Sequence, residues 1–530
     1  MPLYILGFAL FAWLGYWLAK TAAPVDGASG GAVMTAEAEK PREVVENEVR
    51  RTQIVARERS QEMDLEAAMA GAYEGQRVLV FKDQDALEAF LRRAGSGISV
   101  LGRLDALNSL RVGFSDYDDL AGLLDGDEEE YLLFPVITPI PGEGSVQAGA
   151  VGLGNQLLQW LGVDGDNSGW GSGVTVAILD TGVASHSAFG ADIEWLNLVD
   201  LPADLTELNG HGTAVASVII GESSLTPGVA PETDILSIRI ADDSGTSNSY
   251  LLAEGIVAAV DAGVDLINIS MASLGDSGIV QKAVEYALEQ GVLIVAASGN
   301  NGTDQVSYPA AYDGVVAVGA VDGVNDYLEF SNYGEEIDIA AAGLEVYVAQ
   351  PDEQGASVSG TSFSSPIVAG AISAIMSEEG VSATQAWDLL TDYLNDGGAE
   401  GEDAELGGGT PDLWRVFNGD TAGIYDAAVA SQRIIDASAT YPYGQVEVLV
   451  QNQGTETLIN TTVTIDTGGG TEAVNITQLA PNGTETVLVP VTSLDSDLTV
   501  RSQVTTGDGQ EDARTTNNVR INTYAGTGAE

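Results

Sequence analysis

The chain has 530 residues, of which 45% are hydrophobic and none is cysteine, and its formal net charge at pH 7 is −58. This length and apolar content exclude a disordered chain and are enough for roughly two to four domains with at least one large core. The lack of cysteine excludes disulfides, thiol catalysis and cysteine-based zinc sites.

The charges are unevenly distributed along the chain. Thirteen of the 20 Lys and Arg lie at or before Arg111, and residues 151–400 contain only Arg239 and Lys282 against 36 acids. We therefore do not expect nucleic acid as a partner, because phosphate binding depends on cationic side chains. We interpret the acidity as adaptation of the surface to salty water, where screening relieves self-repulsion, with calcium binding as the alternative.

Residues 1–20 carry no charged side chain before Lys20. A run of about seventeen apolar-to-neutral residues is barely long enough to span a bilayer and rather long for the core of a signal peptide. A cut after Ala23 would place Pro24 next, which disfavours processing, so we favour a membrane anchor through residues 2–19 over a removed signal. Either interpretation predicts an exported protein, in the periplasm, at the cell surface or outside the cell, and the orientation in the membrane stays open.

The next part of the chain is predicted to hold a spacer and a small domain. Residues 21–76 are expected to form a linker with a solvated helix. Within residues 77–145, the predicted strands are 77–83, 97–104, 108–114 and 131–142, and the predicted helices are 85–95 and 116–126. This order is that of a ferredoxin-like α+β unit, which could also be a plain spacer domain.

Residues 146–420 are predicted to form an α/β domain. Short, almost continuously apolar strands are expected at 174–180, 234–240, 265–270, 293–298, 315–320 and 337–343. Amphipathic runs such as 249–263 and 278–291 lie between them, and helices are expected at 364–379 and 383–394. The pattern indicates a doubly wound parallel sheet, whose active site should lie beyond the carboxyl ends of the strands.

Residues 421–530 are predicted to form an antiparallel β-sandwich. Thr, Val, Asn and Gly dominate this region, hydrophobic residues alternate with polar ones, and the turn signals NQG, GGG and PNG separate the strands. This all-β, Ig-like pattern is typical of a sandwich of about a hundred residues.

Several polar residues stand at ends of the predicted α/β strands or before helices. Asp180 ends one strand, Asn300 closes another, and His211 precedes a helix. The chain has two histidines, of which we interpret His186 as structural. The segment SGTSFSSPIVAGA contains several hydroxyl side chains that could supply a nucleophile, although helix capping alone would explain them, as it would a lone histidine before a helix.

Taken together, these residues resemble the subtilisin-like serine proteases of peptidase family S8. The resemblance rests on AILDTGV, NGHGTAVAS, AASGNNG and GTSFSSPIVAG, four motifs in family order over about half of the chain. The order Asp, His, Ser is that of the subtilisin template. The resemblance implies that Ser362 is the nucleophile, His211 the general base and Asp180 its orienting acid, with Asn300 in the oxyanion hole.

The resemblance also implies how a peptide substrate would bind. The substrate would pair with residues 270–273 and with the loop 242–247. The first pocket would be lined by Ser270, Met271, Ala272, Ala297, Ser298, Gly299 and Ser307. None of these is charged, so we expect a broad or apolar preference, while Asp242 and Asp243 could favour basic residues further from the cut.

Some positions depart from the family pattern. Ala214 stands where a second histidine is common, and Ala188 stands where a calcium ligand is found in the best-known members. We therefore carry over no calcium site: the chemistry requires no cofactor, and a structural calcium ion stays unassigned. Phe363 replaces a methionine that often follows the nucleophile, which predicts tolerance of peroxide.

By the same resemblance, residues 77–145 are expected to be a propeptide that inhibits the enzyme, a zymogen, and is cut off by the enzyme itself within residues 142–152. The sandwich is similar to adhesion-related modules of exported bacterial enzymes (CARDB-like), with passive stabilisation as the alternative. The alternative for the whole chain is a catalytically silent binding protein on a protease scaffold.

Overall fold

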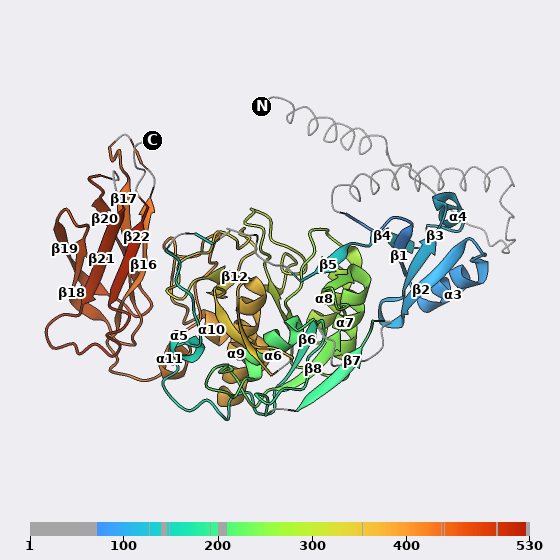
Figure 1. The fold of residues 1–530 in the computed structure, drawn as a ribbon, viewed down its shortest axis with the longest axis horizontal. Helices are drawn as coiled ribbons and strands as arrows, with labels where there is room; N and C mark the ends of the chain where they lie inside the picture. The colour runs from blue at the N-terminus through green and yellow to red at the C-terminus, as the bar shows by residue number, and fades with distance from the viewer. Residues whose placement is uncertain are drawn as a thin grey trace, which may run out of the picture. The chain divides into compact units, whose positions relative to one another are not determined.

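The computed structural model describes residues 71–126, 128–138, 142, 146–147, 149–190, 192–199, 209–351, 353–435, 437–438, 440–493 and 497–525. All of them belong to one unit of the chain, Gln53–Glu530. They form a small N-terminal domain drawn in blue, an α/β domain drawn from cyan through green and yellow to light orange, and a C-terminal β-sandwich drawn in deep orange to red (Figure 1).

The N-terminal domain is a four-stranded antiparallel sheet with two helices. Its elements are β1 (Gln76–Phe81), α3 (Gln84–Arg93), β2 (Ile98–Leu104), the short 3-10 helix η1 (Asp105–Leu107), β3 (Ser109–Phe114), α4 (Tyr117–Ala121) and β4 (Glu128–Tyr131). The strand order β2-β3-β1-β4 is that of a ferredoxin-like unit. Leu79, Phe90, Leu110, Val112 and Leu120 are fully buried in its core.

The last predicted strand of this domain, 131–142, was wrong in its position. The fourth strand of the sheet is the acidic β4, which pairs with β1, and the apolar residues after it leave the sheet. They form β5 (Pro135–Ile137), which pairs with β9 (Thr246–Asn248) of the α/β domain. The apolar run is therefore buried by another domain, which hydrophobicity alone did not indicate.

The α/β domain is built on a seven-stranded parallel sheet. The strands are β6 (Thr175–Asp180), β7 (Ile193–Asn197), β8 (Asp234–Arg239), β10 (Leu266–Ile269), β11 (Leu293–Ala297), β12 (Val315–Val321) and β13 (Ile339–Ala342). Their order in the sheet is β13-β12-β11-β10-β6-β8-β7. This confirms the predicted subtilisin-like parallel α/β fold.

Helices cover both faces of this sheet. Along β6, Val176 and Ile178 belong to the core cluster that contains α6 (His211–Ile220) and α9 (Thr361–Glu379). Ala177 and Leu179 belong to the cluster that contains α7 (Ser249–Ala262) and α8 (Gly278–Glu289). Because successive side chains of a strand point to opposite faces, the two helix pairs lie on opposite sides of the sheet.

Some elements of this domain were not predicted. The edge strand β7 is mostly exposed, so it lacks the apolar run by which the other strands were found. The hairpin of β14 (Val346–Ala349) and β15 (Gly355–Val358) was also missed. The remaining helices are α5 (Leu157–Trp160), α10 (Ala383–Thr391) and α11 (Leu413–Asn418).

The C-terminal domain consists of two antiparallel sheets. Its strands are β16 (Ala427–Ile435), β17 (Gln445–Asn452), β18 (Leu458–Asp466), β19 (Thr471–Leu479), β20 (Thr484–Pro490), β21 (Leu498–Thr505) and β22 (Val519–Tyr524). One sheet has the order β16-β17-β20 and the other β19-β18-β21-β22. Alternate residues such as Val446, Val448 and Val450 are buried between them, as expected for a sandwich.

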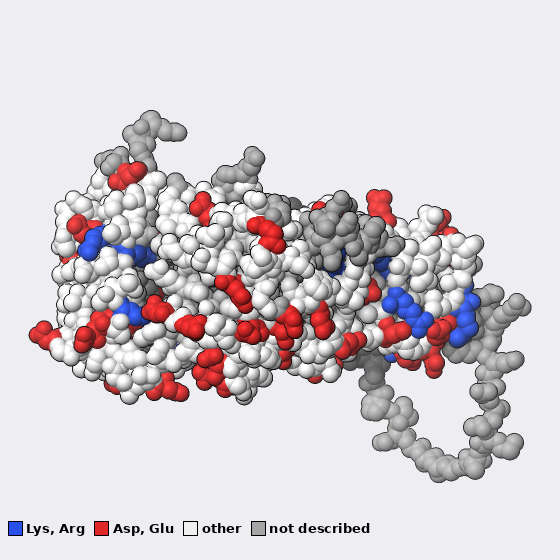
Figure 2. Space-filling view, turned by 60° about the horizontal axis from the view of Figure 1, so that its bottom comes forward, with Lys and Arg blue, Asp and Glu red and all other residues white. Residues whose placement is uncertain are grey.

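Acidic side chains are spread over the surface. Figure 2 shows them across the whole of one face, while Lys and Arg appear mainly towards its two ends. Within the part of the chain that the structure describes, no helix is long and apolar enough to cross a membrane. Residues 1–20, where we predict an anchor or signal, lie outside that part.

Candidate active site

Two of the predicted site residues, Asp180 and His211, are joined by a hydrogen bond between their side chains. Asp180 is the last residue of β6 and His211 the first of α6, and both carboxylate oxygens of Asp180 lie 2.9 Å from Nδ1 of His211. Asp180 is fully buried, and its Oδ1 also accepts the N–H of Thr181 at 2.7 Å. A buried carboxylate on Nδ1 holds the ring with its proton on that nitrogen, so that Nε2 becomes the acceptor.

The first turn of α6 packs closely against the end of β6. A Cβ on Gly212 would lie 2.3 Å from the carbonyl oxygen of Gly182, so only glycine fits there without a shift. The N–H of Gly212 donates to Oγ1 of Thr181 at 3.1 Å. These contacts bring His211 next to Asp180.

Ser362 lies in the first turn of α9 and is fully buried. Pro366 has no N–H, so the carbonyl of Ser362 lacks its usual helical donor. Instead, Oγ of Ser270 donates to this carbonyl at 2.8 Å, and Oγ of Ser362 donates to the carbonyl of Ser270 at 3.1 Å. The two serines thus fix the start of α9 against the residue that follows β10.

The start of α9 lies beside the imidazole ring. The ring of Phe363, the residue after Ser362, packs 5.6 Å from the ring of His211. Nε2 of His211 is buried and has no hydrogen-bond partner within the described ranges. A buried polar atom without a partner needs an explanation, and this end of the ring, opposite Asp180, is where a general base would take a proton.

Asn300 follows β11 and faces the same helix start. Its Oδ1 accepts the backbone N–H of Thr361 at 2.9 Å and the hydroxyl of Thr361 at 2.9 Å. These two bonds fix the orientation of the amide. The backbone N–H of Ser362, in the first turn of α9, has no acceptor within the helix. The structure therefore brings Asp180, His211, Asn300 and Ser362 together at the carboxyl ends of the strands.

The space between residues 242–247 and residues 270–273, which we call the groove, is occupied by the chain itself. β5 pairs antiparallel with β9, with Ile137 opposite Thr246. On its other side, Ile137 exchanges both backbone hydrogen bonds with Ala272, at 2.8 and 2.9 Å. The N–H of Thr138 then donates to the carbonyl of Gly245 at 3.2 Å. Residues 135–138 therefore form the middle strand between the two segments that we predicted to hold a substrate.

The residues predicted to line the first pocket lie around the end of this groove. Ser270 and Met271 are fully buried, Ala272 pairs with Ile137, and Ser273 pairs with Tyr308. Ala297, Ser298, Gly299 and Ser307 are also buried.

Sequence reasoning missed Asn332. Its Nδ2 donates to the carbonyl of Ser298 at 3.1 Å and to Oγ of Ser307 at 3.2 Å, and its Oδ1 accepts the N–H of Asn301 at 2.8 Å. This side chain ties the pocket wall together from a loop after β12, where no spacing to the motifs pointed to it.

The two acids of the groove loop already have partners inside the protein. Asp243 forms an ion pair of 2.6 Å with Arg239. Burial alone would raise the pKa of Asp242, but hydrogen bonds from Ser244 and Thr246 outweigh it, so the pKa lies below its ordinary value. Both acids hold the loop in shape, which weakens the expectation that they select basic residues.

The second histidine lies apart from the catalytic hydrogen bonds. Nδ1 of His186 accepts the N–H of Ala188 at 3.0 Å, and its Nε2 lies 3.8 Å from Glu353. Within the described residues, no group of three or more His, Cys, Asp or Glu could hold a metal ion.

The parallel α/β sheet, with a hydroxyl, an imidazole and a carboxylate at its strand ends, defines a serine hydrolase of the subtilisin-like class. Comparison with known proteins specifies it further. Residues 171–409 match the model of the subtilase family. Thermitase of Thermoactinomyces vulgaris is 37% identical over 220 residues, which cover 40% of this chain and 78% of thermitase.

Two further relatives agree. Subtilisin Savinase of Lederbergia lenta is 39% identical over 203 residues, which cover 38% of this chain and 75% of Savinase. The thermophilic serine proteinase of Bacillus sp. strain AK1 is 36% identical over 232 residues, 42% of this chain and 58% of that proteinase. The chain belongs to the subtilase family and is a serine endopeptidase, acting on proteins or peptides.

Proposed function

We propose that the chain is an exported endopeptidase that cleaves itself once and then hydrolyses peptide bonds with Ser362, His211 and Asp180. The observation that carries this proposal is the hydrogen bond from His211 to the buried Asp180, with Nε2 of the same ring left without a partner beside α9. This arrangement supports a base that is oriented but not yet paired with its nucleophile.

In the proposed reaction, Oγ of Ser362 turns from the Ser270 carbonyl to His211 and loses its proton to Nε2 as it attacks the scissile carbonyl. Asp180 stabilises the imidazolium, which then gives the proton to the leaving amine. Asn300 and the N–H of Ser362 donate to the oxyanion. Water, activated by the same imidazole, then releases the acyl group from Ser362.

We further propose that the N-terminal domain is the inhibitory propeptide. The pairing of residues 135–138 with both walls of the groove supports this, because a chain in that place excludes a substrate. From Gln147 onwards, the chain bonds to the α/β domain: Gln147 donates to the carbonyl of Tyr327, and Val151 donates to Asp322. We therefore expect self-cleavage between Thr138 and Gln147, which overlaps the first part of the interval 142–152.

The test is the hydrolysis of casein by the purified chain and by three variants. Ser362→Ala and His211→Ala should each lower kcat by about 10⁴-fold or more and should stay uncut. His186→Ala, the matched control, should process itself and retain activity. Mass spectrometry of the mature N-terminus checks the position of the cut. Equal hydrolysis by the unmodified chain and Ser362→Ala would reject Ser362 as the nucleophile, and no hydrolysis by a folded, processed chain would favour a binding protein on a protease scaffold.

Export is part of the same proposal, supported by the apolar residues 1–20. Because the proposed self-cleavage removes these residues from the mature enzyme, mass spectrometry of the N-terminus of the uncut Ser362→Ala chain decides whether they are retained as an anchor.

A further inference from the structure

The segment that fills the groove makes further hydrogen bonds at Phe134, the residue just before β5. The N–H of Phe134 donates to Oγ of Ser249 at 3.1 Å, and the N–H of Ser249 donates to the carbonyl of Phe134 at 2.9 Å. These bonds extend the pairing of β5 with β9 by one residue. Phe134 is 1% exposed in the uncut chain, where Leu132 and Ala72 of the N-terminal domain also pack in its cluster.

Two glycines of the α/β domain make room for aromatic rings of the segment before the proposed cut. A Cβ on Gly275 would lie 2.2 to 2.6 Å from three ring atoms of Phe134, and a Cβ on Gly278 would lie 2.1 to 2.6 Å from three ring atoms of Tyr131. Neither glycine has a positive φ. The backbone therefore does not require glycine at either position, and what the missing side chain provides is space for a ring.

We propose that Gly275 and Ser249 form a notch that binds an aromatic side chain of an extended peptide substrate. The aromatic residue would stand three positions before the residue that pairs with Ala272, as Phe134 stands before Ile137. The notch is remote from the reacting atoms and adds affinity, not chemistry. This inference rests on the self-processing proposed above, because the propeptide must leave before a substrate can take its place.

The choice of an aromatic ligand follows from the shape and the bonds of the notch. A flat ring can lie against a backbone that carries no Cβ, and burial of a phenylalanine side chain is among the largest gains that one residue can contribute. The hydrogen bonds of Ser249 go to the backbone of the bound segment, so they fix its register. They can form with any residue at that position except proline, which has no N–H. The ring is then the feature that distinguishes one peptide from another.

The first test uses the full chain after it has processed itself. The peptides Phe-Pro-Val-Ile-Thr and Ala-Pro-Val-Ile-Thr, both acetylated, compete with labelled casein. The phenylalanine peptide should inhibit about tenfold more strongly, the lower end of what burial of this side chain gives, because the peptide lacks the neighbours Leu132 and Ala72. In Gly275→Ala, the ratio should fall to about one, because the new Cβ takes the place of the ring.

Gly169→Ala is the matched control, because Gly169 is exposed and a Cβ there would meet nothing within 4 Å. This variant should keep the tenfold ratio. Equal inhibition by the two peptides in the unmodified enzyme, while casein is still hydrolysed, would overturn the notch and leave the endopeptidase intact.

A second measurement does not depend on activity. In a full chain that carries Ser362→Ala and so cannot cut itself, hydrogen exchange is followed at the N–H of Ile137, which donates to Ala272. Adding Gly275→Ala should speed this exchange about tenfold, and adding Gly169→Ala should not. Equal exchange in the two variants would overturn the ring contact, whether or not the enzyme proves active.

Discussion

At the scale of single residues, Pro366 and Ser270 act on the same carbonyl group. Pro366 removes the helical donor to the Ser362 carbonyl, and the hydroxyl of Ser270 replaces it. The sequence indicated Ser270 only as part of a pocket, because a residue's hydrogen bond to a segment 92 positions away leaves no trace in local pattern. By contrast, Asp180, His211, Asn300 and Ser362 could be predicted, since each stands in a motif at a strand end or helix start.

Asn300 gives the first prediction at this scale. Asn300→Ala should lower kcat by about 10²–10³-fold with little change in KM, because an oxyanion donor acts in the transition state. Casein or peptide hydrolysis measures both constants. Asn301→Ala, at the exposed neighbouring position, should stay within a few-fold of the unmodified enzyme. A large rise in KM with kcat unchanged would contradict the assignment.

Phe363 gives the second prediction at the scale of single residues. Its ring is 6% exposed and packs against the ring of His211, so oxidation of a methionine at this position would place a polar sulfoxide next to the base. The unmodified enzyme should keep its activity in dilute hydrogen peroxide, and Phe363→Met should lose it. Because Met271 is also buried near the groove, Met271→Leu serves as the control. Rapid inactivation of the unmodified enzyme and of Met271→Leu alike would contradict the prediction.

At the scale of elements, the buried parallel strands were the most predictable part of the fold, because burial on both faces requires continuous apolar runs. β4 and β7 were not predictable in this way. β4 contains three successive glutamates and β7 is mostly exposed, so tertiary pairing alone makes them strands. For the same reason, the apolar residues 132–137 were assigned to the wrong sheet, and their place in the groove appeared only in the structure.

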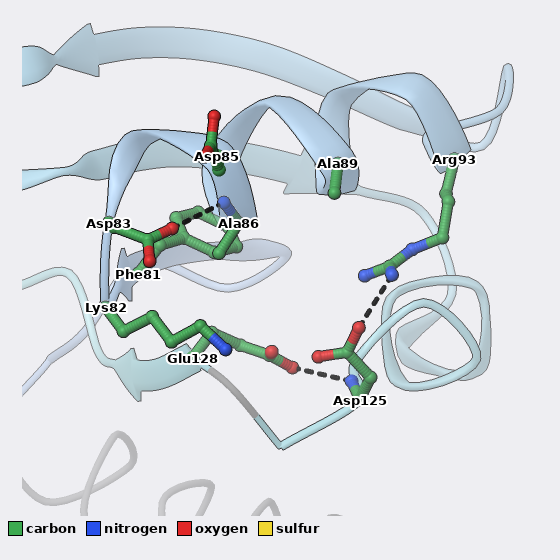
Figure 3. A pocket seen from close by; sticks show the side chains of 9 residues that line it. All are labelled: Phe81, Lys82, Asp83, Asp85, Ala86, Ala89, Arg93, Asp125 and Glu128. Carbon is green, nitrogen blue, oxygen red and sulfur yellow. Dashed lines mark hydrogen bonds and ion pairs between the residues drawn. The ribbon is translucent and has the colours of Figure 1, made fainter. Parts of the chain in front are cut away.

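We expect Glu128, the first residue of β4, to make the stability of the N-terminal domain depend on pH. Figure 3 shows its carboxylate in a pocket beside Lys82 and Asp125, with Arg93 paired to Asp125 at 2.6 Å. Burial raises the pKa of Glu128 to about 7, and the neighbouring Asp125 adds to the rise. The folded domain therefore holds this proton more tightly than the unfolded chain, where the ordinary pKa is 4.5.

The stability from this proton is fully present below the unfolded pKa and is lost as the pH rises through about 7. In the uncut Ser362→Ala chain, hydrogen exchange in β1 should accelerate from about pH 5 to about pH 8 beyond the intrinsic change of rate. Glu128→Gln should remove the extra acceleration, and Glu74→Gln, at an exposed position, should retain it. The prediction fails if hydrogen exchange in β1 depends on pH in the same way with Glu128→Gln as with Glu128 unchanged.

At the scale of the whole molecule, three of the scarce arginines join the sandwich to the α/β domain. Arg415 of α11 donates to Asn482 at 2.5 Å, and Arg520 of β22 pairs with Asp326 at 2.6 Å. The third is Arg514. In a chain of net charge −58, this placement favours a bracing role for the sandwich over that of a freely tethered adhesion module.

Arg514 is the centre of this interface. Its guanidinium pairs with Asp412 and Asp426 at 2.7 Å each, donates to Gln453 at 2.8 Å and lies 4.3 Å from the centre of the Trp414 ring. Asp412 and Trp414 belong to the α/β side of the interface, and Asp426 and Gln453 to the sandwich side. Both carboxylates are buried.

Arg514→Met should lower the free energy of unfolding by about 3–5 kcal/mol, because it leaves two buried carboxylates without their partner. Thermal unfolding and the half-life of activity on heating measure the loss. Arg501→Met, in the same sandwich but exposed, should change stability by less than about 0.5 kcal/mol. Equal stability of the two variants would show that the sandwich does not brace the enzyme.

The central claim is that Ser362 is a nucleophile activated by His211. Labelling of the processed chain with a fluorophosphonate, followed by mass spectrometry of its peptides, tests this most directly. The account predicts a single adduct, on Ser362. An adduct on another serine, or none in a folded and processed chain, would contradict it.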